Sequence, residues 1–110
     1  MTTSTSELWL LESPMEIIAG ETITFSIEWL GATTLASPTG YVYFNDADVT
    51  SAIMAGGSHS VSGNVQILKS ITARSTEQGG SYVVVAECTA DGNTERRKLE
   101  LRVLSASEEQ

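Results

Sequence analysis

A regular alternation of apolar and polar side chains from Glu21 to Trp29 constrains this chain more than any other feature. The apolar residues stand at every second position: Ile23, Phe25, Ile27 and Trp29. The positions between them carry hydroxyl or acidic side chains. A period of two in a segment rich in β-branched and aromatic residues predicts a strand with one buried face. That face requires a second apolar surface to cover it.

The C-terminal part repeats the alternation twice and predicts a hairpin. From Ser81 to Thr89 one face carries Tyr82, Val84, Ala86 and Cys88, and the other carries Val83 and Val85 before Glu87. A turn signal follows at Ala90-Asp91-Gly92-Asn93. The strand expected from Thr94 to Leu104 then has Leu99, Leu101 and Val103 inward, and Arg96, Lys98, Glu100 and Arg102 outward.

Weaker signals predict further strands between these. The expected ranges are Glu7–Leu11, Met15–Ile18 beyond the break at Ser13-Pro14, Gly40–Phe44, Ser58–Val61 and Asn64–Ile71. The last two form a hairpin around Ser62-Gly63. The range 48–55 fits either a helical turn capped by Asp48 and ended by Gly56-Gly57, or an edge strand.

About seven short strands separated by turn signals predict an all-β, antiparallel sandwich. The length of 110 residues suits one domain, and a composition of 41% hydrophobic and 18% charged residues suits a packed core. We expect the domain to span residues 7–104, with flexible ends at 1–6 and 105–110. The single cysteine, Cys88, cannot form an internal disulfide and is expected to be a buried thiol.

The segments Gly20–Ile27 and Gly80–Val84 resemble the second and sixth strands of immunoglobulin-like domains. The resemblance places Ile27 and Val84 where the two disulfide cysteines of that family stand. It also implies that Tyr82 forms the tyrosine corner, and that Tyr41 or Tyr43 replaces the core tryptophan of the third strand. A packed aliphatic pair in place of the crosslink is similar to the disulfide-free bacterial and phage versions of the fold.

A second resemblance covers about a third of the chain. The Gly-x-x-Tyr start of the strand at Gly79–Val85, the Thr-x-x-Gly turn at Thr89–Gly92 and the arginine-rich strand to Val103 are similar to small immunoglobulin-like proteins encoded among phage and prophage structural genes. The resemblance implies an accessory part of a virion head or tail.

The charge distribution is asymmetric. The net charge is −8, which argues against a nucleic-acid partner, because such a partner requires a cationic surface. Residues 1–68 carry seven acids and no base, so all six bases lie between Lys69 and Arg102. Arg96, Lys98 and Arg102 would form a cationic stripe, which either protects the sheet from edge pairing or docks an acidic partner, such as another copy.

No residues converge on a catalytic or metal-binding pattern. His59 points away from Ser58 and Ser60 on a strand, and no Gly-x-Ser-x-Gly elbow is present. Asp46 and Asp48 form a short acidic turn, where a turn with a helix cap competes with a cation site. We therefore expect no enzyme, no cofactor and no metal. No apolar run approaches the roughly 20 residues of a membrane helix, and residues 1–6 lack the features of a signal peptide.

The aromatic residues supply the remaining candidates. Trp29 lies on the same strand face as the apolar residues from Ile23 to Ile27 and is therefore expected in the core. Whether Trp9 faces inward or outward is left open by the alternation. Tyr41 and Tyr43 share one strand face and are candidates for a partner-binding patch. The core set is therefore Ile27, Trp29, Tyr82 and Val84, and the surface set is Tyr41, Tyr43, Arg96, Lys98 and Arg102. Two functions compete: a non-catalytic virion accessory module with a protein partner, or a carbohydrate-binding or adhesive domain on a bacterial surface. The expected location is accordingly the virion or host cytoplasm, or else the bacterial cell surface.

Overall fold

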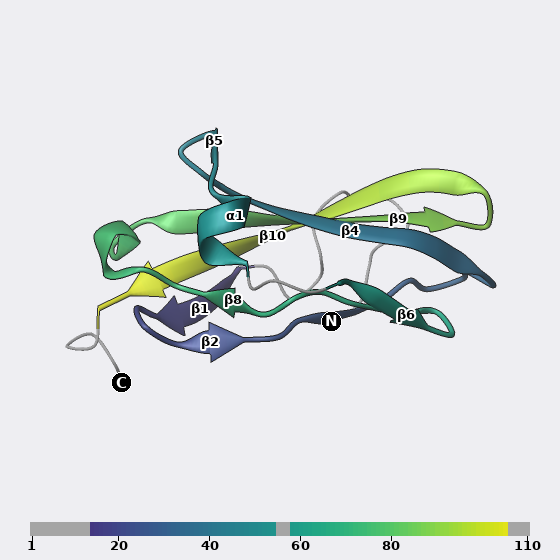
Figure 1. Cartoon of the computed structure of the whole chain (residues 1–110), viewed down its shortest axis with the longest axis horizontal. Helices are drawn as coiled ribbons and strands as arrows, with labels where there is room; N and C mark the ends of the chain where they lie inside the picture. Colours follow the sequence, from purple (N-terminus) through teal and green to yellow (C-terminus); the bar gives the residue numbers. More distant parts are fainter. Residues whose placement is uncertain (1–13, 55–57, 106–110) are drawn as a thin grey trace.

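The computed structural model describes residues 14–54 and 58–105, and these form two facing layers of β-strands (Figure 1). One layer, which we call the long layer, has five strands. Their spatial order is β1 (Met15–Ile18), β10 (Asn93–Leu104), β9 (Ser81–Ala90), β4 (Leu35–Phe44) and β5 (Ala47–Asp48). The strands β4, β9 and β10 are long. β9 pairs with β10 in continuous register, and it pairs with β4 in register except for one shift between Ala36 and Thr39.

The opposite layer, which we call the short layer, is built from short segments. It contains β2 (Thr22–Ile23) paired with β8 (Ile71–Thr72), and β3 (Ser26–Glu28) paired with β7 (Val65–Ile67), which also pairs with β6 (Ser60–Ser62). A single helical turn, α1 (Thr50–Ile53), and a 3₁₀ turn, η1 (Ser75–Glu77), complete the described elements. β2 and β3 are consecutive segments of the chain, and so are β7 and β8, but the pairs β2–β8 and β3–β7 belong to separate hydrogen-bonded groups. The short layer is therefore an interrupted sheet.

This arrangement is an all-β sandwich, as the alternation predicts, and it is immunoglobulin-like, as the resemblance implies. Every strand pair is antiparallel except β1 with β10, which run parallel from Met15 opposite Leu101 to Ile18 opposite Leu104. The first described strand therefore joins the last strand in the long layer, while the next segments cross to the short layer.

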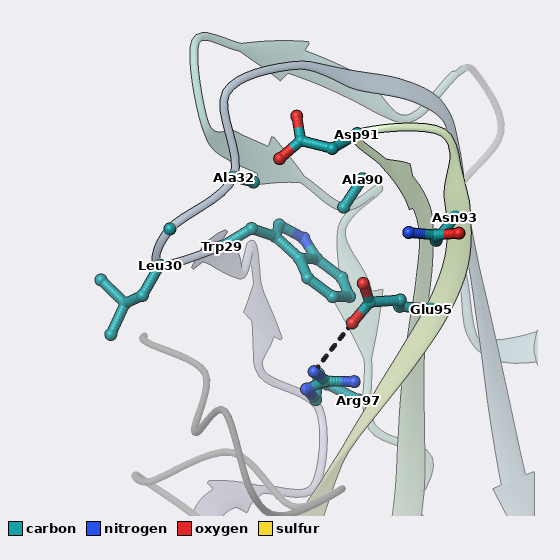
Figure 2. Close-up of a pocket in the computed structure, with 9 residues that line it drawn as sticks. Trp29, Leu30, Ala32, Ala90, Asp91, Asn93, Glu95 and Arg97 are labelled. Atoms are coloured by element: carbon teal, nitrogen blue, oxygen red, sulfur yellow. Dashed lines mark hydrogen bonds and ion pairs between the residues drawn. The ribbon is translucent and has the colours of Figure 1, made fainter.

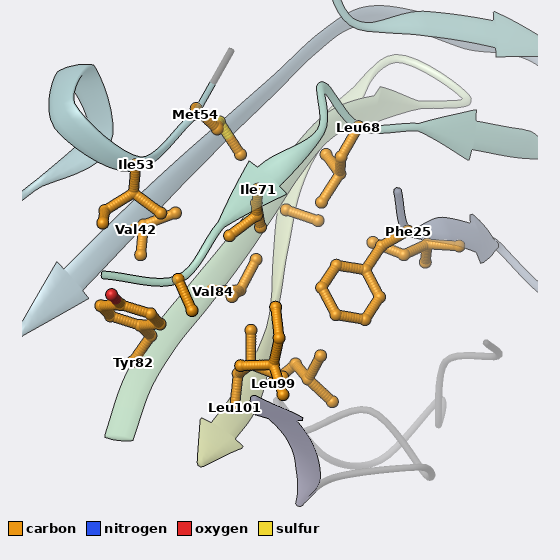
Figure 3. Close-up of a cluster of buried hydrophobic side chains, with 14 of the residues drawn as sticks. Phe25, Val42, Ile53, Met54, Leu68, Ile71, Tyr82, Val84, Leu99 and Leu101 are labelled. Carbon is orange, nitrogen blue, oxygen red and sulfur yellow. The ribbon is translucent and has the colours of Figure 1, made fainter. Parts of the chain in front are cut away.

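The hydrophobic core fills the space between the layers (Figure 3). Ile27 of β3 and Val84 of β9 are both buried in it, with exposed fractions of 1% and 3%. Leu99, Leu101 and Val103 of β10 also face this core, which confirms the predicted inward phase of the last strand. Cys88 is a buried free thiol and forms no disulfide, so the two layers are held together by apolar packing.

The predicted hairpin of β9 and β10 is confirmed. Its turn residues Asp91 and Gly92 have φ values of 50° and 88°, as a type I′ turn requires. The Asp91 carboxylate accepts hydrogen bonds from the backbone N–H groups of Thr33 (3.0 Å) and Thr34 (2.8 Å). These bonds lower the pKa of Asp91 and tie the turn to the loop before β4.

Three strand predictions were wrong in extent. The expected strand from Asn64 to Ile71 is divided into β7 and β8, although the predicted hairpin around Ser62-Gly63 is confirmed by the pairing of β6 with β7. The expected strand from Glu21 to Trp29 is divided into β2 and β3, although its inward phase is kept. β4 begins at Leu35, five residues before the predicted start at Gly40, and its register with β9 shifts between Ala36 and Thr39. Ser37 has φ 50° and Pro38 follows it, so a bulge admits a proline that a regular inner strand would exclude.

The segment after β5 combines both predicted alternatives. Asp48 ends the edge strand β5, and one turn of helix follows from Thr50 to Ile53. Val49 rather than Asp48 is the N-cap residue, but the Asp48 carboxylate accepts the backbone N–H of Thr50 at 2.9 Å. The predicted stop at Gly56-Gly57 lies outside the described residues, as do the expected strand at 7–11, the N-terminal end 1–6 and residues 106–110 of the expected tail.

Candidate functional site

Tyr41 and Tyr43 lie on the outer face of the long layer. They are half-buried, whereas Val42 between them is fully buried in the core. The expectation that one of the tyrosines replaces the core tryptophan was therefore wrong. The phase of β4 after its bulge turns Val42 and Phe44 inward, and Val42 pairs in register with Val84.

Three strands bring the outward residues of this face together. Tyr41 of β4 is opposite Val85 of β9, which in turn is opposite Lys98 of β10. We call this surface the tyrosine–arginine face, and it consists of Tyr41, Tyr43, Val83, Val85, Arg96 and Lys98. A shallow depression across it also borders Asn45, Asp46 and Ser81. The sequence predicts that the two tyrosines and the basic residues are exposed but does not show that they are neighbours. The register of the sheet brings them side by side.

The side chains of the tyrosine–arginine face contact one another. The Tyr41 and Tyr43 ring centroids are 6.5 Å apart with planes inclined by 36°, so the rings do not form one flat platform. The Arg96 guanidinium carbon lies 5.9 Å from the Tyr41 ring centroid. At this distance the cation and the ring face attract each other, which holds both side chains in place.

Each arginine of the predicted cationic stripe faces a carboxylate. Arg96 forms an ion pair with Glu87, and this contact raises the pKa of Arg96. Arg102 lies 3.4 Å from a carboxylate oxygen of Glu100, which stands between Lys98 and Arg102 on β10. The stripe is therefore a surface of mixed charge, with Glu100 among its bases and Glu87 beside Arg96. Such a surface favours orientation of a partner over attraction at long range.

The other polar candidates have local structural roles. Asn45 and Asp46 both have positive φ, at 51° and 66°, and form the two-residue turn between β4 and β5. His59 Nδ1 accepts the backbone N–H of Lys69 at 3.2 Å, and burial lowers the pKa of His59. The Cys88 thiol donates to the Ala36 carbonyl at 3.3 Å, and burial raises its pKa. Within residues 14–54 and 58–105, no three His, Cys, Asp or Glu side chains gather at a metal-binding distance.

Sequence reasoning missed a buried polar connection between the layers. Gln66 of β7 is completely buried, and its amide oxygen accepts the indole N–H of Trp29 at 2.9 Å. Its amide nitrogen donates to the carbonyls of Thr39 and Glu87, each at 3.0 Å, beside the bulge in β4. The sequence indicates the burial of Gln66 only through strand alternation, because Gln66 stands two positions before Leu68 and thus shares its inward face.

Arg97 completes this end of the sandwich (Figure 2). Its guanidinium carbon lies 5.3 Å from the centroid of the Trp29 ring, and it forms an ion pair with Glu95 at 3.0 Å. A pocket borders these side chains and the turn at Asp91, with the exposed Leu30 at its rim. The carboxylates of Asp91 and Glu95 and the terminal nitrogens of Arg97 are engaged with their neighbours. The Nε atom of Arg97 is buried and has no hydrogen-bond partner in the described part of the chain.

Tyr82 forms the tyrosine corner at the start of β9. Its hydroxyl accepts the backbone N–H of Arg74 at 3.0 Å and donates to the Glu77 carboxylate at 2.5 Å. Burial is the main reason that the pKa of Tyr82 is raised to about 12. The ion pair with Arg74 holds the pKa of Glu77 below its ordinary value. This network fixes the turn that leads into β9.

Comparison with known proteins finds similar solved structures at low sequence identity. No family model and no curated protein matches the chain. A three-domain immunoglobulin fragment of titin covers 86% of this chain at 15% identity with a TM-score of 0.48, and this chain spans 30% of that fragment. A second similar structure is a complex of titin with obscurin-like 1, with 16% identity and a TM-score of 0.47, covering 84% of this chain and 87% of that chain. A third is that of titin domains in complex with telethonin, with 19% identity and a TM-score of 0.46, covering 84% of this chain and 44% of that chain.

Within the described ranges, no helix has the length and apolar character needed to cross a membrane.

Proposed function

We propose that this chain is a non-catalytic interaction module that binds a protein partner through the tyrosine–arginine face. The observation that carries the proposal is the outward set of Tyr41, Tyr43 and Arg96 on the long layer. Tyrosine and arginine are the residue types that contribute most to binding energy at protein interfaces. Their rings and guanidinium are already held by mutual contacts, so binding would cost little conformational entropy.

The resemblance of the hairpin segment to phage and prophage structural proteins suggests where such a module would act. We place it in a virion head or tail, as an accessory domain that contacts another virion protein. The ion pairs Arg96–Glu87 and Arg102–Glu100 support a partner surface that also carries charges of both signs. The carbohydrate alternative has weaker support, because Trp29 is buried and the two tyrosine rings are inclined to each other.

Site-specific photocrosslinking tests the binding face. A benzophenone amino acid replaces Tyr43 in one variant and Thr72, which is exposed on the short layer, in a matched variant. The proposal predicts a crosslinked partner at position 43 that wild-type chain competes away, and no such product at position 72. Crosslinking at 72 alone would contradict the proposal.

Composition of purified particles tests the virion context. If the gene lies in a phage or prophage, mass spectrometry of induced, gradient-purified particles is expected to detect the chain in a fixed ratio to a structural protein. Its complete absence from particles, together with binding to glycans that Tyr41→Ala removes, would instead favour the carbohydrate-binding alternative.

A further inference from the structure

The pocket at the turn of the β9–β10 hairpin has fixed walls (Figure 2). Asp91 joins this turn to the loop before β4, because its carboxylate accepts the backbone N–H groups of Thr33 and Thr34. The Asp91 N–H also donates to the Thr34 carbonyl at 3.0 Å, and the Ala32 N–H donates to the Trp29 carbonyl at 3.1 Å. These bonds hold both walls, so binding in the pocket requires little ordering of the loop.

One wall of the pocket is the polar continuation of a core face. Asn93, Glu95 and Arg97 alternate along β10 on the face that carries Leu99 in the core, and all three line the pocket. Apart from Asp91, the other lining residues are apolar or lack a side chain: Trp29, Leu30, Gly31, Ala32 and Ala90. The pocket volume is about 250 Å³, below the roughly 300–1,000 Å³ of sites for small organic ligands, so the pocket suits a single side chain of a partner protein.

The charge that the pocket presents to solvent is negative. The Glu95 side chain is 38% exposed and Asp91 is exposed as well, whereas the Arg97 side chain is only 12% exposed because it lies against the Trp29 ring. No Lys or Arg occurs between residues 14 and 54, so the loop side of the pocket adds no positive charge. A cation at the pocket mouth would therefore be attracted to both carboxylates.

The hydrogen-bonding groups of the pocket also favour a cationic ligand. Arg97 donates to only one carboxylate oxygen of Glu95, Oε1, so Oε2 retains its capacity to accept. Arg97 offers less to an acidic ligand, because its terminal nitrogens already bond Glu95 and the Arg96 carbonyl and its Nε is buried. An acidic ligand would in addition be repelled by Asp91 and Glu95.

We propose that this pocket binds one lysine or arginine side chain of a partner protein. The aliphatic stem of that side chain would pack on the apolar lining, and its charged head would reach the Glu95 and Asp91 carboxylates. The pocket shares no residue with the tyrosine–arginine face, so its test is independent of the proposed function.

NMR titration with acetyl-Gly-Arg-Gly-amide and acetyl-Gly-Lys-Gly-amide tests the proposal, with acetyl-Gly-Gln-Gly-amide as the matched neutral peptide. Both basic peptides are expected to shift the indole N–H of Trp29 and the backbone N–H groups of Asn93 and Glu95 in a saturable manner. They are expected to bind about fivefold more tightly than the glutamine peptide at low salt, and the preference is expected to shrink at high salt.

Two pairs of variants test which groups hold the side chain. Glu95→Gln removes one carboxylate, although its amide oxygen can still accept from Arg97, and is expected to weaken binding of the basic peptides about fivefold. Glu16→Gln makes the same charge change at an exposed position on β1 and is expected to leave binding unchanged.

Asn93→Lys brings an ammonium group to the pocket and is expected to weaken binding about tenfold or more. Thr94→Lys adds the same charge at the next exposed position, on the opposite face of β10, and is its matched control. Thermal unfolding confirms that each variant folds.

Equal binding of the glutamine peptide would overturn the proposal, as would tighter binding of acetyl-Gly-Glu-Gly-amide. Saturable shifts that lie only outside the pocket would also overturn it. If Glu95→Gln fails to fold, the comparison of Asn93→Lys with Thr94→Lys decides, and equal binding by these two variants would contradict the assignment of the pocket.

Discussion

The two layers of the sandwich solve the same packing problem by different means. In the long layer, β4, β9 and β10 run for ten residues or more, and β9 pairs with both of its neighbours, with one register shift against β4. In the short layer, each strand has two or three residues, and side-chain bonds such as those of Gln66 supplement the backbone. The comparison indicates that the long layer is a platform that can carry exposed aromatic side chains, whereas the short layer depends on individual buried residues.

The largest effect is expected from truncation of the short layer's central core residue. Ile27→Ala removes a buried side chain from β3 and leaves a cavity against the long layer, which costs about 3–4 kcal/mol of unfolding free energy. Urea denaturation monitored by tryptophan fluorescence measures it. Val61→Ala is the control on the same layer, because Val61 is exposed and its replacement is expected to change stability by less than about 0.5 kcal/mol.

Removal of the hydrogen bonds that Gln66 makes between the layers is expected to lower the free energy of unfolding by nearly as much. Gln66→Leu keeps the side-chain volume but removes the acceptor of the Trp29 indole N–H and two bonds to the carbonyls of Thr39 and Glu87, at a cost of about 3 kcal/mol. The same denaturation measures it, with the exposed Gln78→Leu as control. A loss below about 0.5 kcal/mol would show that the short layer does not depend on this amide.

The tyrosine corner is expected to contribute less, with a dependence on pH. Tyr82→Phe removes a buried hydroxyl that bonds Arg74 and Glu77, at a cost of about 1–2 kcal/mol at neutral pH. Because the folded pKa of Glu77 is lowered from the ordinary 4.5, its contribution is present above that pH and is lost as pH falls through the folded value.

Glu77→Gln tests this pH dependence directly. The variant is expected to be less stable than wild type at pH 7, and the difference is expected to shrink as pH falls below about 4.5. Thermal unfolding from pH 7 to pH 3 measures both. A constant difference across this range would mean that the Glu77 charge does not stabilise the corner.

The smallest effect is expected on the outer face of the long layer. Tyr43→Ala removes a half-buried ring outside the core and is expected to cost less than about 1 kcal/mol, while it weakens capture of the partner. Denaturation and crosslinking yield together separate the two effects. A large loss of stability would mean that this ring is structural and would break the contrast between the layers.

The long layer was the easier to predict from sequence, for a physical reason. The outward positions of β9 and β10 next to the solvent are polar or charged at Glu87, Arg96 and Arg102, so the alternation is visible in the sequence itself. The first half of β4 was missed, and the register shift between Ala36 and Thr39 interrupts the regular alternation there. The register that joins Tyr41 to Lys98 is a long-range property, which no local pattern contains.

For the short layer, the sequence predicted which residues face inward but not where the strands begin and end. Ile23, Phe25 and Ile27 face inward as the alternation indicates, yet the division between β2 and β3 leaves no mark in the sequence. Gln66 was missed because a single polar residue in a core phase is usually read as an outward position. Only the structure shows that its three hydrogen bonds balance the cost of burying an amide.

Native-state hydrogen exchange tests the contrast between the layers most directly. The account predicts that amides of the β9–β10 and β4–β9 ladders exchange only through global unfolding, while those of β2, β6 and β8 exchange through local opening at a lower free energy. Equal protection across both sheets, or stronger protection of the short strands, would contradict it.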